Sequence, residues 1–167
     1  MSATAVLDLT IDAVGFRNPE DAAALVHVLD DYARDPMGGG EPLASDVRER
    51  LAAGLAGVPG AFAFLARLSG RAVGAAVCFT GFSTFAARPL VNVHDVCVMA
   101  PHRGRGIARA LFARIETEAR ARGACKITLE VLSDNHGAKR LYKSLGYDDY
   151  VLDPEAGHAL FWQKRLT

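Results

Sequence analysis

The sequence predicts a mixed α/β fold in a single domain that spans residues 1–167. Segments with strand-like alternation and segments with helical spacing follow one another along the chain. The clearest helical segment is 105–122, where Ile107, Leu111, Ile115 and Ala119 form one apolar stripe. The 167 residues are 50% hydrophobic and 23% charged, which is too apolar for a disordered chain and enough to bury a core. No run reaches the roughly 18 apolar residues of a membrane helix, so we expect no membrane partner.

The first half of the chain predicts a strand, two helices and a strand pair. Alternation around 7–16 indicates a strand, and Asn18-Pro19-Glu20 is typical of a helix start, with apolar spacing continuing to Ala33. The glycine- and proline-rich stretch 35–42 predicts a mobile loop. Ser45 is the expected cap of a second helix. We expect that helix at 46–56. Two strands should follow at 61–67 and 72–80, joined by a turn at 68–71.

The second half predicts further strands around two helices. A strand near 91–99 precedes the helix at 105–122, and a short strand follows at 126–132. Asp134 is the expected cap of a helix near 135–145 that ends at Gly146. Two last strands are expected near 147–152 and 158–166.

The charges are balanced overall but unevenly distributed. The 19 basic and 19 acidic residues give a formal net charge of zero, which removes the basic signature of a nucleic-acid binder. Residues 1–60 nevertheless carry ten acidic and four basic residues, whereas 101–126 carry seven basic and two acidic ones. This distribution indicates an anionic ligand near 101–126, with a solvated helix face as the alternative.

The cysteines and the N-terminus indicate a reducing compartment. Cys78, Cys97 and Cys125 are odd in number, lie in apolar or strand-like stretches and form no C-x-x-C pair. We therefore expect buried thiols, and no residues have the spacing of metal ligands. The first residues lack the basic and apolar regions of a signal peptide, so we expect a cytoplasmic protein.

The strongest local feature is a glycine-rich turn, Pro101 to Ala108, between a strand and a helix. Glycines at 104 and 106 allow close approach of the backbone, and a helix N-terminus offers unpaired N–H groups to phosphate oxygens. Arg103 and Arg105 add positive charge. A P-loop has no matching run here, and a dinucleotide fingerprint would need Gly or Ala where Arg109 stands.

Two spaced motifs carry a family resemblance. The first is R-x-x-G-x-A, from Arg103 to Ala108, and the second runs from Asn135 through Leu141-Tyr142 to Gly146-Tyr147. Together they resemble the GNAT superfamily of N-acetyltransferases, densely over 91–147 and loosely over the N-terminal third. The resemblance implies a GNAT-like mixed, V-splayed central sheet flanked by about four helices.

The resemblance also implies acetyl-CoA as cofactor, bound between the strands 91–99 and 126–132. The pyrophosphate is expected on the backbone N–H groups from Arg103 to Arg109, and the pantetheine arm on the first of these strands. The implied cofactor-binding residues are Val96, Cys97, Val98, Arg103, Gly104, Arg105, Gly106, Ile107, Ala108, Arg109 and Asn135. For Asn135, a role as helix cap without ligand is the alternative.

Tyr142 and His94 are the implied catalytic residues. Tyr142 matches the family's usual general acid, because a phenol can protonate a departing thiolate, and a core tyrosine is the alternative. His94 is the candidate base, acting directly or through water, or a histidine without a catalytic role. The run from Pro89 to Met99 is similar to diamine (spermidine/spermine) N-acetyltransferases, which carry an acidic residue at the His94 position. Strand alternation predicts that His94 and Asp95 point to opposite faces.

The acceptor is expected among acidic residues of the N-terminal region. Besides Asp95, the candidate substrate-binding residues are Asp31, Tyr32, Asp35 and Glu41, with Asp30 beside them, and solvated helix ends are the alternative. The predicted function is acetyl transfer to a primary amine, a small cationic amine or diamine, by direct attack in a ternary complex. Acetylation of protein N-termini or lysines and a non-catalytic acyl-CoA sensor are the alternatives. A homodimer is possible, although no residue fixes an interface.

Overall fold

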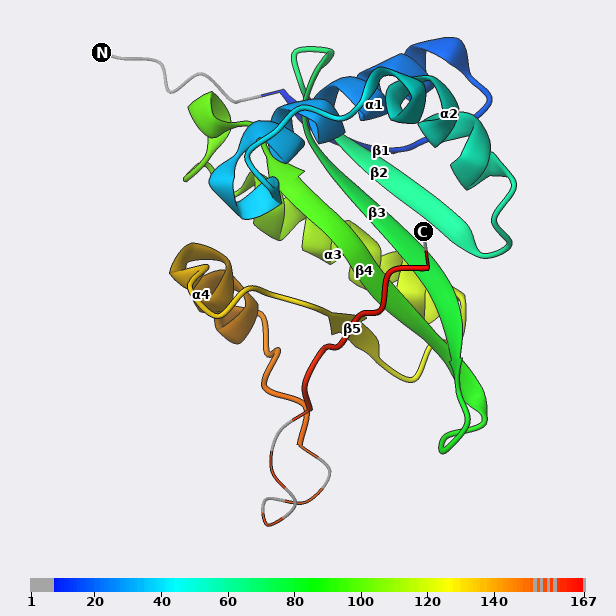
Figure 1. Ribbon diagram of the computed structural model, residues 1–167, viewed down its shortest axis with the longest axis vertical. Coiled ribbons are helices and arrows are strands. Elements are labelled where there is room, and N and C mark those ends of the chain that lie inside the picture. Colours follow the sequence, from blue (N-terminus) through cyan, green and yellow to red (C-terminus); the bar gives the residue numbers. More distant parts are fainter. Residues whose placement is uncertain (1–7, 152, 154, 156, 158, 167) are drawn as a thin grey trace. The chain divides into compact units, whose positions relative to one another are not determined.

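The computed structural model describes residues 8–151, 153, 155, 157 and 159–166. The chain divides into two compact units, Met1–Leu129 and Glu130–Thr167. Figure 1 shows their helices and strands, coloured along the sequence. The single domain therefore stays a prediction.

The first unit is built on one five-stranded mixed sheet in the order β1-β2-β3-β4-β5. The first four strands pair antiparallel, while β4 and β5 run parallel. The strands are β1 Leu9–Ala13, β2 Ala61–Leu68, β3 Arg71–Ser83, β4 Arg88–Val98 and β5 Ile127–Leu129. The predicted mixed α/β class is therefore confirmed.

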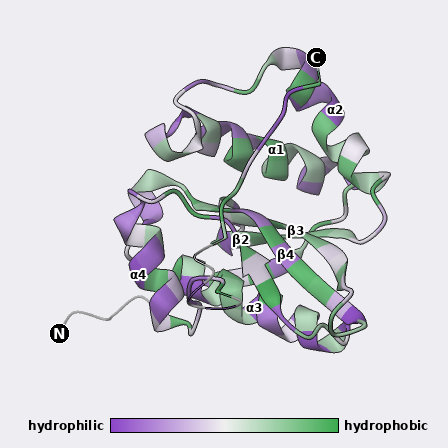
Figure 2. Cartoon of the chain, turned by 60° about the horizontal axis from the view of Figure 1, so that its bottom comes forward, coloured by the Kyte–Doolittle hydropathy of each residue, from purple (hydrophilic) through white to green (hydrophobic). Residues whose placement is uncertain are grey.

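Three helices cover this sheet, and a fourth belongs to the second unit. Helices α1 and α2 lie on one face of the sheet and α3 on the other (Figure 2). The helices are α1 Pro19–Arg34, α2 Ser45–Ala56, α3 Ile107–Ala121 and α4 His136–Ser144, with 3-10 turns η1 Pro36–Gly38 and η2 Ala100–His102. In the described part of the chain, no helix is long and apolar enough to cross a membrane.

The sheet is apolar on both faces because a helix layer packs against each. On one face, Leu25 and Val28 of α1 are buried in a cluster with Leu65 and Val77. The opposite face packs against the predicted apolar stripe of α3, whose Ile107, Leu111, Ile115 and Ala119 are all buried. Arginines at the rim of this layer stack on the strand aromatics, with Arg114 over Phe64 and Arg122 over Phe62.

Of three predicted N-cap residues, the structure confirms one and contradicts two. Asn18 caps α1 as predicted, and its Oδ1 accepts from the backbone N–H groups of Glu20 and Asp21. Ser45 is instead the first residue of α2, after Ala44, which forms no side-chain cap. The cap of α4 is Asn135 rather than Asp134, because the helix begins one residue later and Asn135 Oδ1 reaches Ala138 N at 3.1 Å.

Two further expectations differ from the structure. The stretch 35–42 contains the 3-10 turn η1, capped by the side chain of Asp35, so it is more regular than its composition indicates. The strands expected at 147–152 and 158–166 are wrong, because no described residue of these ranges lies in a strand; residues 152 and 158 lie outside the described residues. An alternating pattern forms a strand only when an edge pairs with it. Among the described residues of these ranges, one backbone hydrogen bond joins the two, from Ala159 N to Tyr150 O at 3.5 Å.

Two glycine-to-alanine substitutions test this packing in opposite directions. Gly54 is exposed within α2, and a Cβ added there would meet no atom within 4 Å, whereas a Cβ at Gly74 would lie 2.9 Å from Cys97 O of β4. We expect Gly54→Ala to stabilise the fold by about 0.5–1 kcal/mol, because alanine loses less backbone entropy in a helix. Gly74→Ala should cost roughly 1–3 kcal/mol, because the backbone of β4 must shift. Urea unfolding measures both, and a stable Gly74→Ala variant would contradict the β3–β4 register.

Candidate functional site

A β-bulge in β4 places His94 outside the regular strand ladder. Asp95 pairs with Val77 of β3 and Val93 pairs with Cys78, so two partners on β3 face three residues on β4 and His94 is the extra one. Bulges of this kind turn side chains away from the alternation of the strand and are frequent beside active sites.

The bulge overturns the expectation that His94 and Asp95 point to opposite faces. The exposed His94 ring meets the Phe79 ring edge-on, with centroids 5.4 Å apart. The charge of Asp95 acts on Tyr32, whose pKa it helps to raise. Phe79 and Tyr32 both pack against the core cluster beneath α1, so His94 and Asp95 both border that side of the sheet. The alternation rule fails here because it assumes an uninterrupted ladder.

The pairing of β4 with β5 ends early and leaves part of β4 with one strand neighbour. Parallel pairing joins Val91, Asn92 and Val93 to Ile127, Thr128 and Leu129, respectively. Beyond Val93, the strand continues to Val98 with β3 as its only partner among the described strands. This edge includes Val96, Cys97 and Val98, and an extended ligand with amide groups can pair with such an edge as an added strand.

The turn after β4 leads to an open helix N-terminus. Gly104 and Gly106 have φ of +75° and +79°, and no atom lies within 4 Å of a Cβ built at either position. Gly106 is the N-cap of α3 and no side chain caps the helix there. The first-turn N–H groups, including those of Ile107 and Ala108, have no acceptor within the helix and carry the positive end of its dipole. A ligand that carries phosphate oxygens fits this turn.

The arginines of this turn differ in their surroundings. Arg105 is exposed, with one guanidinium nitrogen 3.5 Å from His102 Nδ1, and Arg109 is exposed on the first turn of α3. Arg103 instead donates from Nε to Val98 O at 2.9 Å and from Nη2 to Asp35 Oδ2 at 2.8 Å. Its backbone N–H donates to Ala100 O at 3.3 Å. The structure thus directs Arg103 toward Asp35, which differs from its expected contribution of charge to the anion site.

Four of the five candidate acceptor residues interact near the C-terminal end of α1. The phenol of Tyr32 is affected by the charges of Asp95 and Asp35, and the buried Cys97 thiol by those of Asp95 and Asp31. Glu41 is exposed and takes no part in the hydrogen bonds that the described residues form here. The structure therefore brings Asp31, Tyr32, Asp35 and Asp95 together, but not Glu41.

Burial and mutual repulsion shift the pKa values of this acidic group. Burial raises the pKa of Asp95, against the opposing effect of His94. Burial raises the pKa of Tyr32, and Asp95 adds to this effect. Burial also raises the pKa of Cys97 to about 12, with a further contribution from Asp95. Asp35 differs, because the Met37 N–H and the Arg103 guanidinium lower its pKa. Burial thus disfavours the charged form of Asp95, and an added cation beside it would favour that form.

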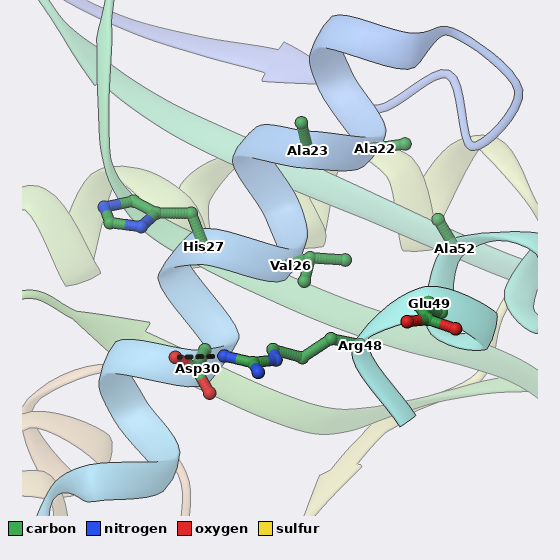
Figure 3. A pocket seen from close by; sticks show the side chains of 8 residues that line it. All are labelled: Ala22, Ala23, Val26, His27, Asp30, Arg48, Glu49 and Ala52. Carbon is green, nitrogen blue, oxygen red and sulfur yellow. Dashed lines mark ion pairs between the residues drawn. The ribbon is translucent and has the colours of Figure 1, made fainter. Parts of the chain in front are cut away.

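Asp30 is occupied in holding the neighbouring elements together. It accepts from Leu43 N at 2.9 Å and pairs with Arg34 at 2.9 Å and with Arg48 of α2 at 3.7 Å. The Arg48 pair lies at one end of a groove of about 420 Å³ between α1 and α2, with Val26 and Ala52 among its apolar lining (Figure 3). The sequence pattern places Asp30 beside the acceptor residues, but it does not predict these structural contacts.

The second unit holds the remaining two candidates. Asn135 caps α4 through Oδ1, which was the alternative to a cofactor contact. Tyr142 is half-buried on α4, with its ring centroid 6.1 Å from that of Tyr147. Both residues belong to the unit Glu130–Thr167.

Comparisons with known proteins identify the family to which this chain is similar. Residues 23–147 match the profile of the Acetyltransferase (GNAT) family. Streptothricin acetyltransferase of Streptomyces lavendulae is 29% identical over 164 residues, which cover 93% of this chain and 78% of that protein. An uncharacterised N-acetyltransferase of Methanocaldococcus jannaschii is 32% identical over 87 residues, 52% of this chain and 38% of that protein. The chain thus spans well under half the length of the first curated relatives it matches.

The fold has close counterparts among solved structures. An aminoglycoside N-acetyltransferase in complex with CoA superposes with a TM-score of 0.73 at 17% identity. The match covers 98% of this chain and 99% of that one. At this identity the similarity concerns the fold.

The half-buried carboxylate of Asp95 predicts a stability that depends on pH. Since its pKa in the fold is raised above the ordinary value of 3.8, the group favours the folded state at low pH and opposes it as pH rises through the folded pKa. Asp95→Asn should therefore have a larger free energy of unfolding than the wild type at pH 7, and this advantage should shrink as pH falls toward 3.8. Denaturant unfolding of both proteins between about pH 4 and 8 measures the difference. An Asn variant that is less stable at every pH would show that the charged carboxylate has a structural partner.

Proposed function

Because the chain belongs to the acetyltransferase (GNAT) family, we propose that it transfers an acetyl group from acetyl-CoA to a primary amine of a small cationic molecule. The single observation that carries this proposal is the sequence of features along β4. The bulge at His94, the half-buried Asp95, the edge without β5 and the open N-terminus of α3 follow one another over residues 94–107.

The proposed binding of acetyl-CoA uses backbone groups. The N–H groups from Gly104 to Ala108 receive the pyrophosphate, for which the absence of atoms around the glycine positions leaves space. The edge of β4 at Val96–Val98 pairs with the pantetheine amides, and one of its N–H groups polarises the reacting carbonyl. The thioester, when bound, supplies an acetyl group that an amine can attack. Arg105 and Arg109 add positive charge at the same turn.

The acceptor is proposed to enter as a cation and to lose a proton before attack. An alkyl ammonium has an ordinary pKa of about 10.4, so it is protonated at neutral pH and a base must take its proton before attack. The site must therefore accommodate both the ammonium and the neutral amine. Asp95 and Asp31 attract the ammonium, and Tyr32 borders the same space. The His94 imidazole, turned outward by the bulge, accepts the proton directly or through a water molecule.

The leaving thiolate is proposed to take its proton from the Tyr142 phenol. A phenol has an ordinary pKa of about 10, so it remains protonated at neutral pH and can still donate to a developing thiolate. The amine nitrogen forms the new bond to the acetyl carbon, the bond from that carbon to sulfur breaks, and the departing sulfur takes the phenolic proton. No covalent enzyme intermediate is required.

The charge of the acceptor residues supports small cationic substrates. Asp35 is already paired with Arg103, whereas Asp95 and Asp31 form no ion pair among the described residues, so the acidic charge that can face an acceptor comes from these two. Two of the similar proteins are named for streptothricin and for aminoglycosides, and diamines are a further candidate. A thioester-consumption screen over diamines, aminoglycosides, amino acids and peptides tests the proposal. Turnover with small cationic amines supports it, while turnover restricted to peptides, or CoA binding without any turnover, contradicts it.

Replacement of the proposed acid separates chemistry from binding. Tyr142→Phe should lower kcat by about 100-fold or more, because a positioned general acid contributes at least that much, while the Kd for CoA stays near the wild-type value. Tyr150→Phe, a change at an exposed tyrosine of the same unit, serves as the control and should keep full turnover. Steady-state kinetics and calorimetry measure the two effects, and wild-type turnover in Tyr142→Phe removes this residue from the acid role.

A further inference from the structure

Arg103 connects two segments that are 68 residues apart in the sequence. Its guanidinium bonds to Asp35 beyond the end of α1 and, at the same time, to Val98 O at the end of β4. Both contacts lie within Met1–Leu129. Arginine is suited to this because its planar, fixed donors can hold a carboxylate and a carbonyl together.

Asp35 in turn organises the 3-10 turn that follows it. Its Oδ1 accepts from Met37 N at 2.9 Å, and its backbone carbonyl accepts from Gly38 N at 2.8 Å and from Gly40 N at 3.0 Å. Segment 35–40 is also fixed to Tyr32. The Tyr32 hydroxyl donates to Met37 O at 3.3 Å, and Gly38 packs so closely on Tyr32 O that it leaves no space for a Cβ.

We propose that Arg103 is a positioning residue, which ties segment 35–40 and Tyr32 to the end of β4, rather than a ligand of the phosphate. This inference rests on the proposed function, because Arg103 would then hold the residues that border the acceptor and the strand that binds acetyl-CoA in a fixed relation. The pair also neutralises Asp35 and leaves Asp95 and Asp31 to face a cationic acceptor. The Met37 N–H and Arg103 lower the pKa of Asp35, so its carboxylate is ionised beside the guanidinium at neutral pH.

A double-mutant cycle on this pair tests the inference. Asp35→Asn keeps an oxygen for Met37 N but removes the charge, and Arg103→Gln removes the guanidinium. Each single variant should raise KM for the acceptor about two- to fivefold, as expected for a half-exposed ion pair, with kcat and the Kd for CoA within about twofold. The double variant should be no worse than the single ones, because both remove the same contact.

A second measurement does not depend on finding an acceptor. Amide hydrogen exchange of Met37, Gly38 and Gly40 should be faster in both single variants, because their acceptors on Asp35 lose the anchor. The matched control is the exposed pair of Asp46 and Arg50 on α2, where Asp46→Asn and Arg50→Gln should change neither exchange nor KM.

The results distinguish positioning from phosphate binding. If Arg103→Gln weakens CoA binding about tenfold or more and leaves exchange at 37–40 unchanged, the inference is overturned. Additive effects of the two variants overturn it as well. If the screen yields no acceptor, the proposed function fails, whereas exchange and CoA calorimetry still decide the role of Arg103.

Discussion

The parallel pairing between β4 and β5 covers only three residue pairs among the described residues. The point at which this pairing ends determines the candidate site. Beyond Val93, β4 keeps β3 as its partner but gains no neighbour on the other side among the described strands of its unit. The bulge at His94 falls at the same point, and the strand then runs through η2 into the glycine turn and α3. One strand thus supplies an exposed histidine, a half-buried carboxylate and an edge without β5, and it leads to a helix N-terminus that no side chain caps.

The electrostatics of the fold are more local than the net charge indicates. Much of the positive charge of 101–126 is paired along α3 and at its C-cap, where Arg114 and Arg122 contact Glu118 and Arg120 contacts Glu116. The negative charge of the N-terminal region is likewise reduced by pairs at Asp30, Asp35 and Asp46. The uneven distribution of charge along the chain is therefore partly cancelled by ion pairs.

Patterns in the sequence predicted the parts of the fold that depend on residues close together along the chain. The stripe of α3, the Asn18 cap and the glycine turn all follow from spacing and backbone chemistry that act within one element. The bulge at His94 and the pair of Arg103 with Asp35 could not be predicted this way. Both arise from register and long-range contact, and a one-residue shift in a strand changes the face of every side chain. The same limit explains the incorrect strands after residue 147, because alternation alone does not provide a pairing edge.

Calorimetric titration with CoA tests most directly whether the open N-terminus of α3 receives the pyrophosphate, as we propose. Gly106→Glu introduces bulk and negative charge at that end, while Gly123→Glu makes the same change just beyond the other end of the helix. Both glycines have a positive φ, +79° and +69°, and open surroundings, so the backbone strain is matched. We predict that Gly106→Glu abolishes binding and that Gly123→Glu retains it. Unchanged affinity in Gly106→Glu, or an equal loss in both variants, would contradict the claim.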